Sequence, residues 1–106
     1  TLMSGPMAED LSLMFSPEDL AQLASNYVVD GQETLKKMSE SHGLGQLDKL
    51  LENAHYLKGS SLLMGFSEVA ALCTEIEENA ANCDAMWMSE VERKMSGLFS
   101  EILSHV

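Results

Sequence analysis

The chain has 106 residues, of which 45% are apolar and 22% charged, and its 17 acidic and 6 basic residues give a formal net charge of −11. This length suits one globular domain. The acidic balance argues against nucleic acid and anionic membranes as partners, because phosphate binding needs clusters of Lys and Arg. No apolar run approaches the roughly 18 residues of a membrane-spanning helix, so we expect no membrane insertion.

The two cysteines, Cys73 and Cys83, favour a reducing compartment. If both lie on one helix, a rise of about 1.5 Å per residue places them roughly 15 Å apart, too far for a disulfide. Unpaired cysteines are typical of cytosolic proteins. We therefore expect a cytoplasmic protein, present also in the nucleus if its source is eukaryotic.

The first helix is predicted over residues 17–41. Ser16 is a good N-cap, and Pro17 suits the first helical position. Apolar side chains then recur every three or four residues. Gly31, in the middle of this run, costs about 1 kcal/mol of helix propensity and indicates a bend or a close helix contact. Gly43 is expected to end the helix in a left-handed cap.

Three further amphipathic segments follow. The second helix is expected to end at Gly65, and Ser67 is predicted to cap the third. A polar break over residues 82–84 precedes a last helix over residues 85–104. The expected apolar stripe of the second helix comprises Leu47, Leu50, Leu51, Ala54, Leu57, Ser61 and Met64.

Four helices with short connections predict an all-α fold, an antiparallel up-down four-helix bundle. The chain has no alternating apolar pattern and no hairpin dipeptide, so no strand is predicted. We expect residues 16–106 to form this one domain. Residues 1–15 are expected to form an N-terminal arm or a short extra helix.

The motifs of self-sufficient enzymes are absent from the sequence. There is no glycine-rich phosphate loop, no Gly-x-Ser-x-Gly and no His-Glu-x-x-His. His42 and His105 fall near expected helix ends, and no second His or Cys lies three or four residues from His55. We therefore predict no metal site and no autonomous catalytic activity.

The second helix carries one chemically suggestive group, centred on His55. At about 100° per residue, His55 falls on the edge of the apolar stripe, flanked one turn later by Lys58 and Gly59. A side chain at position 59 would lean back over the imidazole, so Gly59 leaves the ring open. Lys58 can meet an incoming anion. This pattern suits a phosphoryl acceptor, although a lone histidine on a helix edge is usually an ordinary surface residue.

The run Ala-His-Tyr-Leu-Lys-Gly-Ser-Ser at residues 54–61, followed by Gly65, resembles the signature of histidine-containing phosphotransfer (HPt) domains. The Lys-Gly-Ser-Ser sequence within this run is similar to that of stand-alone fungal and plant members in particular. The resemblance implies that His55 is phosphorylated on Nε2, that Lys58 contacts the phosphoryl group and that Gly59 keeps the site accessible.

Five other residues receive expected roles around this histidine. Ser60 and Ser61 match the motif, and from the helix geometry Ser60 faces outward while Ser61 lies on the core stripe and bonds back to a helix carbonyl. Glu77, on the antiparallel third helix, is expected near His55, where it could bond the ring yet would repel phosphate. Its role is left open. Leu51 and Leu62 are expected to contact docking partners.

The resemblance implies a phosphocarrier without kinase activity, acting in a multistep two-component phosphorelay. Its partners would be a hybrid sensor histidine kinase and the receiver domains of response regulators. No cofactor is expected on this chain, because Mg²⁺ would belong to the receivers. The chain is expected to be a monomer. The alternative is a degenerate HPt-like bundle that only binds or scaffolds partners.

Overall fold

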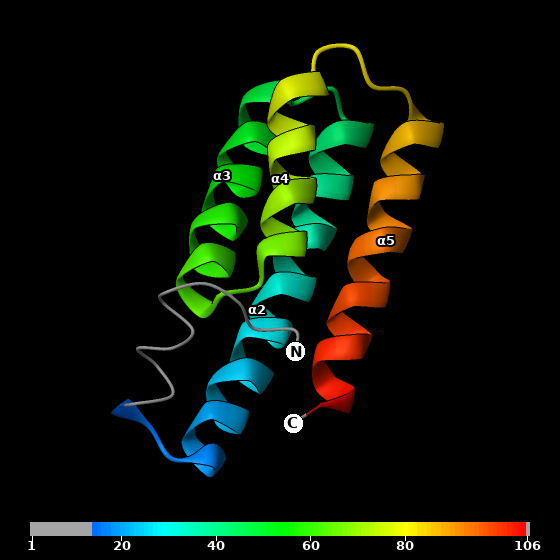
Figure 1. Cartoon of the computed structure of the whole chain (residues 1–106). Helices are drawn as coiled ribbons and strands as arrows, with labels where there is room; N and C mark the ends of the chain where they lie inside the picture. Colours follow the sequence, from blue (N-terminus) through cyan, green and yellow to red (C-terminus); the bar gives the residue numbers. More distant parts are fainter. Residues whose placement is uncertain (1–13, 106) are drawn as a thin grey trace.

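The computed structural model describes residues 14–105, and these form an all-helical bundle with no strands. The helices are α2 (Pro17–Gly43), α3 (Leu47–Met64), α4 (Ser67–Asn79) and α5 (Ala85–Ser104). Successive helices alternate in direction (Figure 1). The predicted antiparallel up-down bundle is therefore confirmed. The arm expected over residues 1–15 lies almost entirely outside the described residues.

The helices do not pack equally closely against one another. α2 packs against both α3 and α5, and α3 packs against α4, whereas the contact between α4 and α5 is much sparser. In Figure 1, α3 and α4 lie together on one side of α2, and α5 lies on the other. The bundle is thus tight around α2 and α3 and looser between α4 and α5.

The predicted start of α2 is confirmed. The backbone N–H of Asp19 donates to Ser16 Oγ at 3.2 Å, and Pro17 occupies the first turn. α5 begins in the same way, with the N–H of Trp87 donating to Asp84 Oδ1 at 2.8 Å. Each side-chain oxygen satisfies a backbone donor that the helix leaves unpaired.

Two of the predicted helix boundaries are wrong in detail. The N-cap of α4 is Phe66, and Ser67 is the first helical residue. The left-handed glycine after α2 is Gly45, with φ +70°, whereas Gly43 is still helical. Only the second of these two neighbouring glycines has the backbone conformation that other residues avoid. Gly65 ends α3 with φ +82°, as expected.

All four helices contribute side chains to the core. One residue of the apolar stripe predicted for α3 is exposed. Leu47, the first residue of α3, is 41% exposed. Buried polar groups are few and satisfied: Thr34 and Ser41 each donate to a carbonyl four residues earlier. The largest fully buried apolar side chains are Phe99, Met38, Leu50, Leu57, Ile76, Met95, Val28, Val69 and Cys73.

Gly31 marks a close contact between α2 and α5. A Cβ at this position would lie 2.7 Å from Cζ of the buried Phe99 ring. No carbon atom tolerates that distance, so the ring occupies the space that any other residue would need. Of the two alternatives for Gly31, the close helix contact is the one observed.

Candidate functional site

His55 lies near the middle of α3 with its side chain 80% exposed. One turn later, Gly59 is helical and a Cβ placed on it would meet nothing within 4 Å. The space beside Gly59, one turn from the ring, is therefore open. The predicted pairing of an exposed imidazole with a cleared approach agrees with this geometry.

Glu77 of α4 bridges His55 and Lys58 of α3. Its Oε2 lies 3.5 Å from His55 Nδ1, and its Oε1 lies 3.2 Å from Lys58 Nζ. Lys58 and Glu77 are both about two-thirds buried, whereas the ring is open to solvent. The antiparallel packing of α3 on α4 thus brings Glu77 to His55, as expected from the sequence.

This arrangement distinguishes the two ring nitrogens. A carboxylate beside Nδ1 favours a hydrogen on that nitrogen, because the carboxylate can only accept. The neutral ring then keeps its lone pair on Nε2. An exposed imidazole with a free Nε2 lone pair and a nearby ammonium can act as a nucleophile toward an electrophilic phosphoryl group.

Ser61 and Ser60 differ in environment. Ser61 is fully buried and donates to the Leu57 carbonyl at 2.6 Å, so the Tyr27 hydroxyl, 2.5 Å away, donates to Ser61 Oγ. Burial raises the pKa of Tyr27 well above its usual value. Ser60 is half-buried, 3.3 Å from the same carbonyl, so it does not face fully outward. Ser61 therefore ties α3 to α2 beneath the site.

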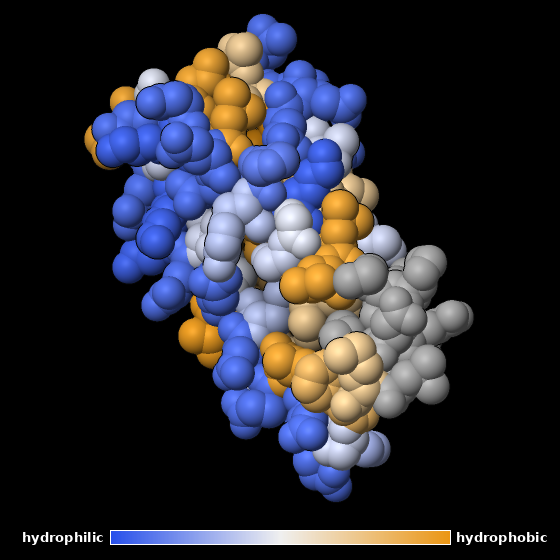
Figure 2. All heavy atoms as spheres, turned by 90° about the vertical axis from the view of Figure 1, so that its left-hand side faces the viewer, coloured by the Kyte–Doolittle hydropathy of each residue, from blue (hydrophilic) through white to orange (hydrophobic). Residues whose placement is uncertain are grey.

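The surface around His55 contains more apolar area than the sequence reasoning identified. Leu62 is half exposed, whereas Leu51 is partly buried against the core. Tyr56 and Leu63 were not predicted to matter, yet both are more than half exposed. Seven residues apart, they share a helix face, which is the signal that could have revealed them. Viewed from the α3 side, most of the surface is hydrophilic and the apolar side chains form separate patches (Figure 2).

Tyr56 also joins α3 to α2 at the surface. Its hydroxyl donates to Asp30 Oδ2 at 2.6 Å. This hydrogen bond, and the negative charge of the carboxylate, raise the pKa of Tyr56. The residue next to His55 is therefore held in one place, although its ring remains accessible.

Among residues 14–105, no three His, Cys, Asp or Glu side chains are grouped so that they could hold a metal ion. No helix in the same range has the length and apolar character needed to cross a membrane.

The fold and the site together define a class of protein: an all-α bundle that carries a solvent-exposed histidine on one helix. Residues 13–101, well over half of the chain, match the Hpt domain, and the chain therefore belongs to the Hpt domain family. Hpt domains are phosphocarriers, not kinases, and they interact with receiver domains and kinases in the phosphorelays of two-component signalling. Comparisons with curated proteins and with solved structures gave no match.

Proposed function

We propose that this chain is the histidine phosphocarrier of a multistep phosphorelay. It accepts a phosphoryl group from a receiver-domain aspartate onto Nε2 of His55 and passes it to the aspartate of a second receiver. The observation that carries this proposal is the geometry of α3, where an 80% exposed imidazole lies beside the open space left by Gly59. A receiver must reach the ring directly, and no side chain of this helix prevents it.

The chemical step needs only groups that the two proteins supply. The Nε2 lone pair attacks phosphorus, the bond from phosphorus to the aspartyl oxygen breaks, and the aspartate leaves as a carboxylate. The imidazole becomes a phosphorylated imidazolium that keeps its hydrogen on Nδ1. Glu77, 3.5 Å from that nitrogen, stabilises the positive charge that develops on the ring.

Lys58 is assigned the contact with the phosphoryl group. In the structure its ammonium is paired with Glu77 at 3.2 Å, and the other oxygen of the same carboxylate lies 3.5 Å from His55 Nδ1. A flexible lysine can turn from a carboxylate to a phosphoryl oxygen without movement of the backbone. Glu77 and Lys58 together balance the charge: the carboxylate supports the ring, and the ammonium offsets the repulsion between carboxylate and phosphate.

The surface around His55 is the proposed docking site for receiver domains and for the receiver of a hybrid sensor kinase. It includes the half-exposed Leu62, the partly buried Leu51 and the exposed Tyr56 and Leu63. An apolar centre with a polar rim is usual for a transient interface. Mg²⁺ is assigned to the receivers. The Lys-Gly-Ser-Ser sequence supports a relay intermediate of the fungal or plant type.

The test is transfer of label from a receiver domain phosphorylated on its aspartate. Wild-type protein is expected to acquire acid-labile phosphate, and His55→Gln is expected to acquire none while keeping its helical circular dichroism signal. His42→Gln is the matched control, because it removes a histidine far along the chain from the site, and it should accept label normally. A folded wild-type protein that binds the receiver but takes no label would instead indicate the degenerate, binding-only bundle.

A further inference from the structure

Tyr56 adjoins the open space at Gly59 that leads to the ring of His55. Counted at about 100° per residue, Gly59 falls between the two, about 40° around the helix from His55 and about 60° from Tyr56. A side chain at position 59 would lean back over the turn that carries both rings, and Gly59 has none. A receiver that enters this space to reach His55 therefore also reaches Tyr56, which is 53% exposed.

Asp30 of α2 fixes the position of the Tyr56 ring in the free chain. The Tyr56 hydroxyl donates to Asp30 Oδ2 at 2.6 Å, and Asp30 forms no ion pair with any side chain of residues 14–105. A side chain that is already ordered loses less conformational entropy on binding than a free one. The hydroxyl also keeps its acceptor when a partner covers the ring, so burial of Tyr56 leaves no unpaired donor.

Among the exposed apolar side chains of this surface, Tyr56 has the strongest physical basis for a dominant contact. Leu62 and Leu63 are exposed to a similar degree, but they have no polar group that could tie them to a neighbouring helix. Tyrosine offers a large contact area with only two side-chain torsions, and it is enriched among the residues that contribute most to binding.

Resting on the proposed function, we propose that Tyr56 is the anchor for docking receiver domains and that Asp30 is a positioning residue that acts through it. The receiver that fits has an apolar surface beside its acceptor aspartate, and the Tyr56 ring packs against that surface while His55 meets the phosphoryl group. A receiver with an acidic side chain at this place is disfavoured, because its charge would face the carboxylate of Asp30.

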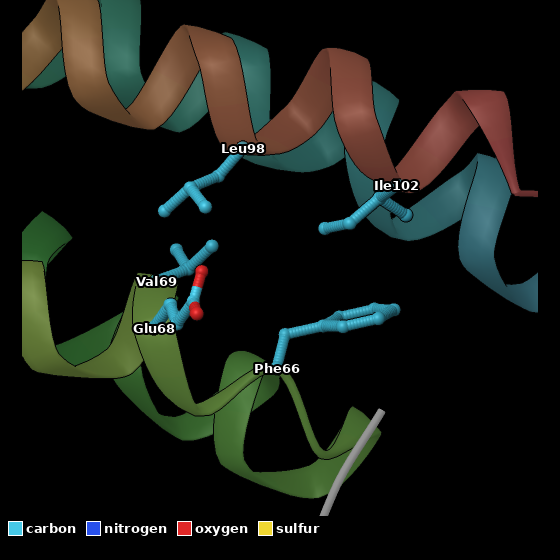
Figure 3. A pocket seen from close by; sticks show the side chains of 5 residues that line it. All are labelled: Phe66, Glu68, Val69, Leu98 and Ile102. Carbon is cyan, nitrogen blue, oxygen red and sulfur yellow. The ribbon is translucent and has the colours of Figure 1, made fainter. Parts of the chain in front are cut away.

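The α4–α5 groove lies on the opposite side of α4 from this surface. In its narrow part, Leu98 and Ile102 of α5 face Phe66, Glu68 and Val69 across a hollow (Figure 3). Counted at about 100° per residue, Glu68 lies about 180° around α4 from Glu77, the residue that faces His55. A receiver docked over His55 therefore leaves the exposed Glu68 uncovered, which makes Glu68 a suitable control position.

Titration calorimetry with the unphosphorylated receiver domain of the labelling test measures docking without transfer. Tyr56→Ala should weaken binding at least tenfold. Tyr56→Phe keeps the ring but loses the hydrogen bond, and it should weaken binding about threefold. At saturating receiver, both variants should transfer phosphate within about twofold of the wild-type rate, because neither loses a group that takes part in the chemical step. Glu68→Ala is the control and should bind like wild type.

The positioning role of Asp30 is tested by a double-mutant cycle. Asp30→Ala should weaken binding about threefold in the wild-type background and have no effect in Tyr56→Phe, because both substitutions remove the same hydrogen bond. Asp30→Asn should restore most of the affinity, since its amide oxygen can accept the bond from Tyr56 without a charge. Circular dichroism checks that each variant keeps the helical fold.

Wild-type affinity of Tyr56→Ala would overturn the proposal, as would additive effects of Asp30→Ala and Tyr56→Phe. An Asp30→Asn protein as weak as Asp30→Ala would also overturn it, since the charge and not the hydrogen bond would then act. So would a lower transfer rate at saturation with unchanged affinity. A wild-type protein that binds the receiver but takes no label would contradict the proposed function alone, because the affinities would still test the anchor.

Discussion

At the scale of single residues, the site is governed by one carboxylate with two partners. Glu77 faces the ring of His55 through one oxygen and the ammonium of Lys58 through the other. Lys58 is therefore paired with the same carboxylate that lies beside His55. In the mechanism that we propose, the arriving phosphoryl group competes with Glu77 for this ammonium, and we therefore expect the lysine to matter most while the group is being transferred.

Lys58→Ala should slow phosphoryl transfer by one to two orders of magnitude and change the affinity for the receiver by less than about threefold. The physical reason is that an ammonium aimed at developing charge stabilises the transition state more than the encounter complex. Single-turnover transfer rates measured against receiver concentration separate the two effects. Loss of affinity with a normal rate inside the complex would instead make Lys58 a docking residue.

Gly59→Gln should impair transfer while the fold becomes no less stable. The new side chain would lean back toward the imidazole, whereas helix propensity improves by roughly 0.5–1 kcal/mol. Urea unfolding and the transfer rate should therefore move in opposite directions. A fully folded variant with the wild-type transfer rate would show that the cleared approach is not needed.

At the scale of helices, the contact of α2 with α5 depends on the absence of a side chain at Gly31. Phe99 is fully buried, and its ring is only 2.7 Å from the position of a Cβ on residue 31. Because a ring in a packed core cannot move aside without displacing its neighbours, overpacking should outweigh any gain in helix propensity.

Gly31→Ala is therefore expected to lower the free energy of unfolding by a net amount of about 1–2 kcal/mol. The cost of overpacking exceeds the gain of about 1 kcal/mol in helix propensity. Gly97→Ala is the matched control, because its Cβ meets nothing in its own chain and should stabilise by up to about 1 kcal/mol. Denaturant unfolding at low protein concentration measures both changes. An equal stabilisation by the two substitutions would contradict the close contact.

Periodicity and capping rules predicted the four helices well, and antiparallel packing correctly placed Glu77 near His55. Those features depend on local sequence and on the order of the helices. The predictions that were wrong concern features that depend on contacts between helices. Leu47 has the apolar spacing but is 41% exposed at the start of α3, and Phe66 rather than Ser67 caps α4. The hydrogen bond from Tyr56 to Asp30 and the α4–α5 groove depend on distances between helices, which the sequence pattern does not specify.

At the scale of the whole molecule, stability should fall in alkaline solution. Burial, and then the charge of Glu77, raise the pKa of the Cys73 thiol from 9.0 to about 12. The unfolded chain releases this proton near pH 9 while the folded protein retains it. The unfolded state thus binds fewer protons, and stability that is complete below pH 9 is lost progressively between about pH 9 and 12.

Between pH 9 and 11, the free energy of unfolding should decline by roughly 1 kcal/mol per pH unit from this group alone. Cys73→Ala should show a shallower decline, whatever its stability at pH 7. Cys83→Ala, which removes a half-buried thiol, should change the slope less. Urea unfolding at several pH values gives these slopes, and equal slopes for wild type and Cys73→Ala would contradict the assignment.

The most direct test of the account is to identify the nitrogen that carries phosphate. Protein labelled with ¹⁵N in its histidine rings would be phosphorylated by a receiver domain and examined by ³¹P and ¹⁵N NMR. We predict a single phosphohistidine, at His55, with phosphorus coupled to Nε2 and the hydrogen retained on Nδ1 beside Glu77. Phosphate on Nδ1, phosphate on His42 or His105, or no phosphohistidine at all would contradict the account.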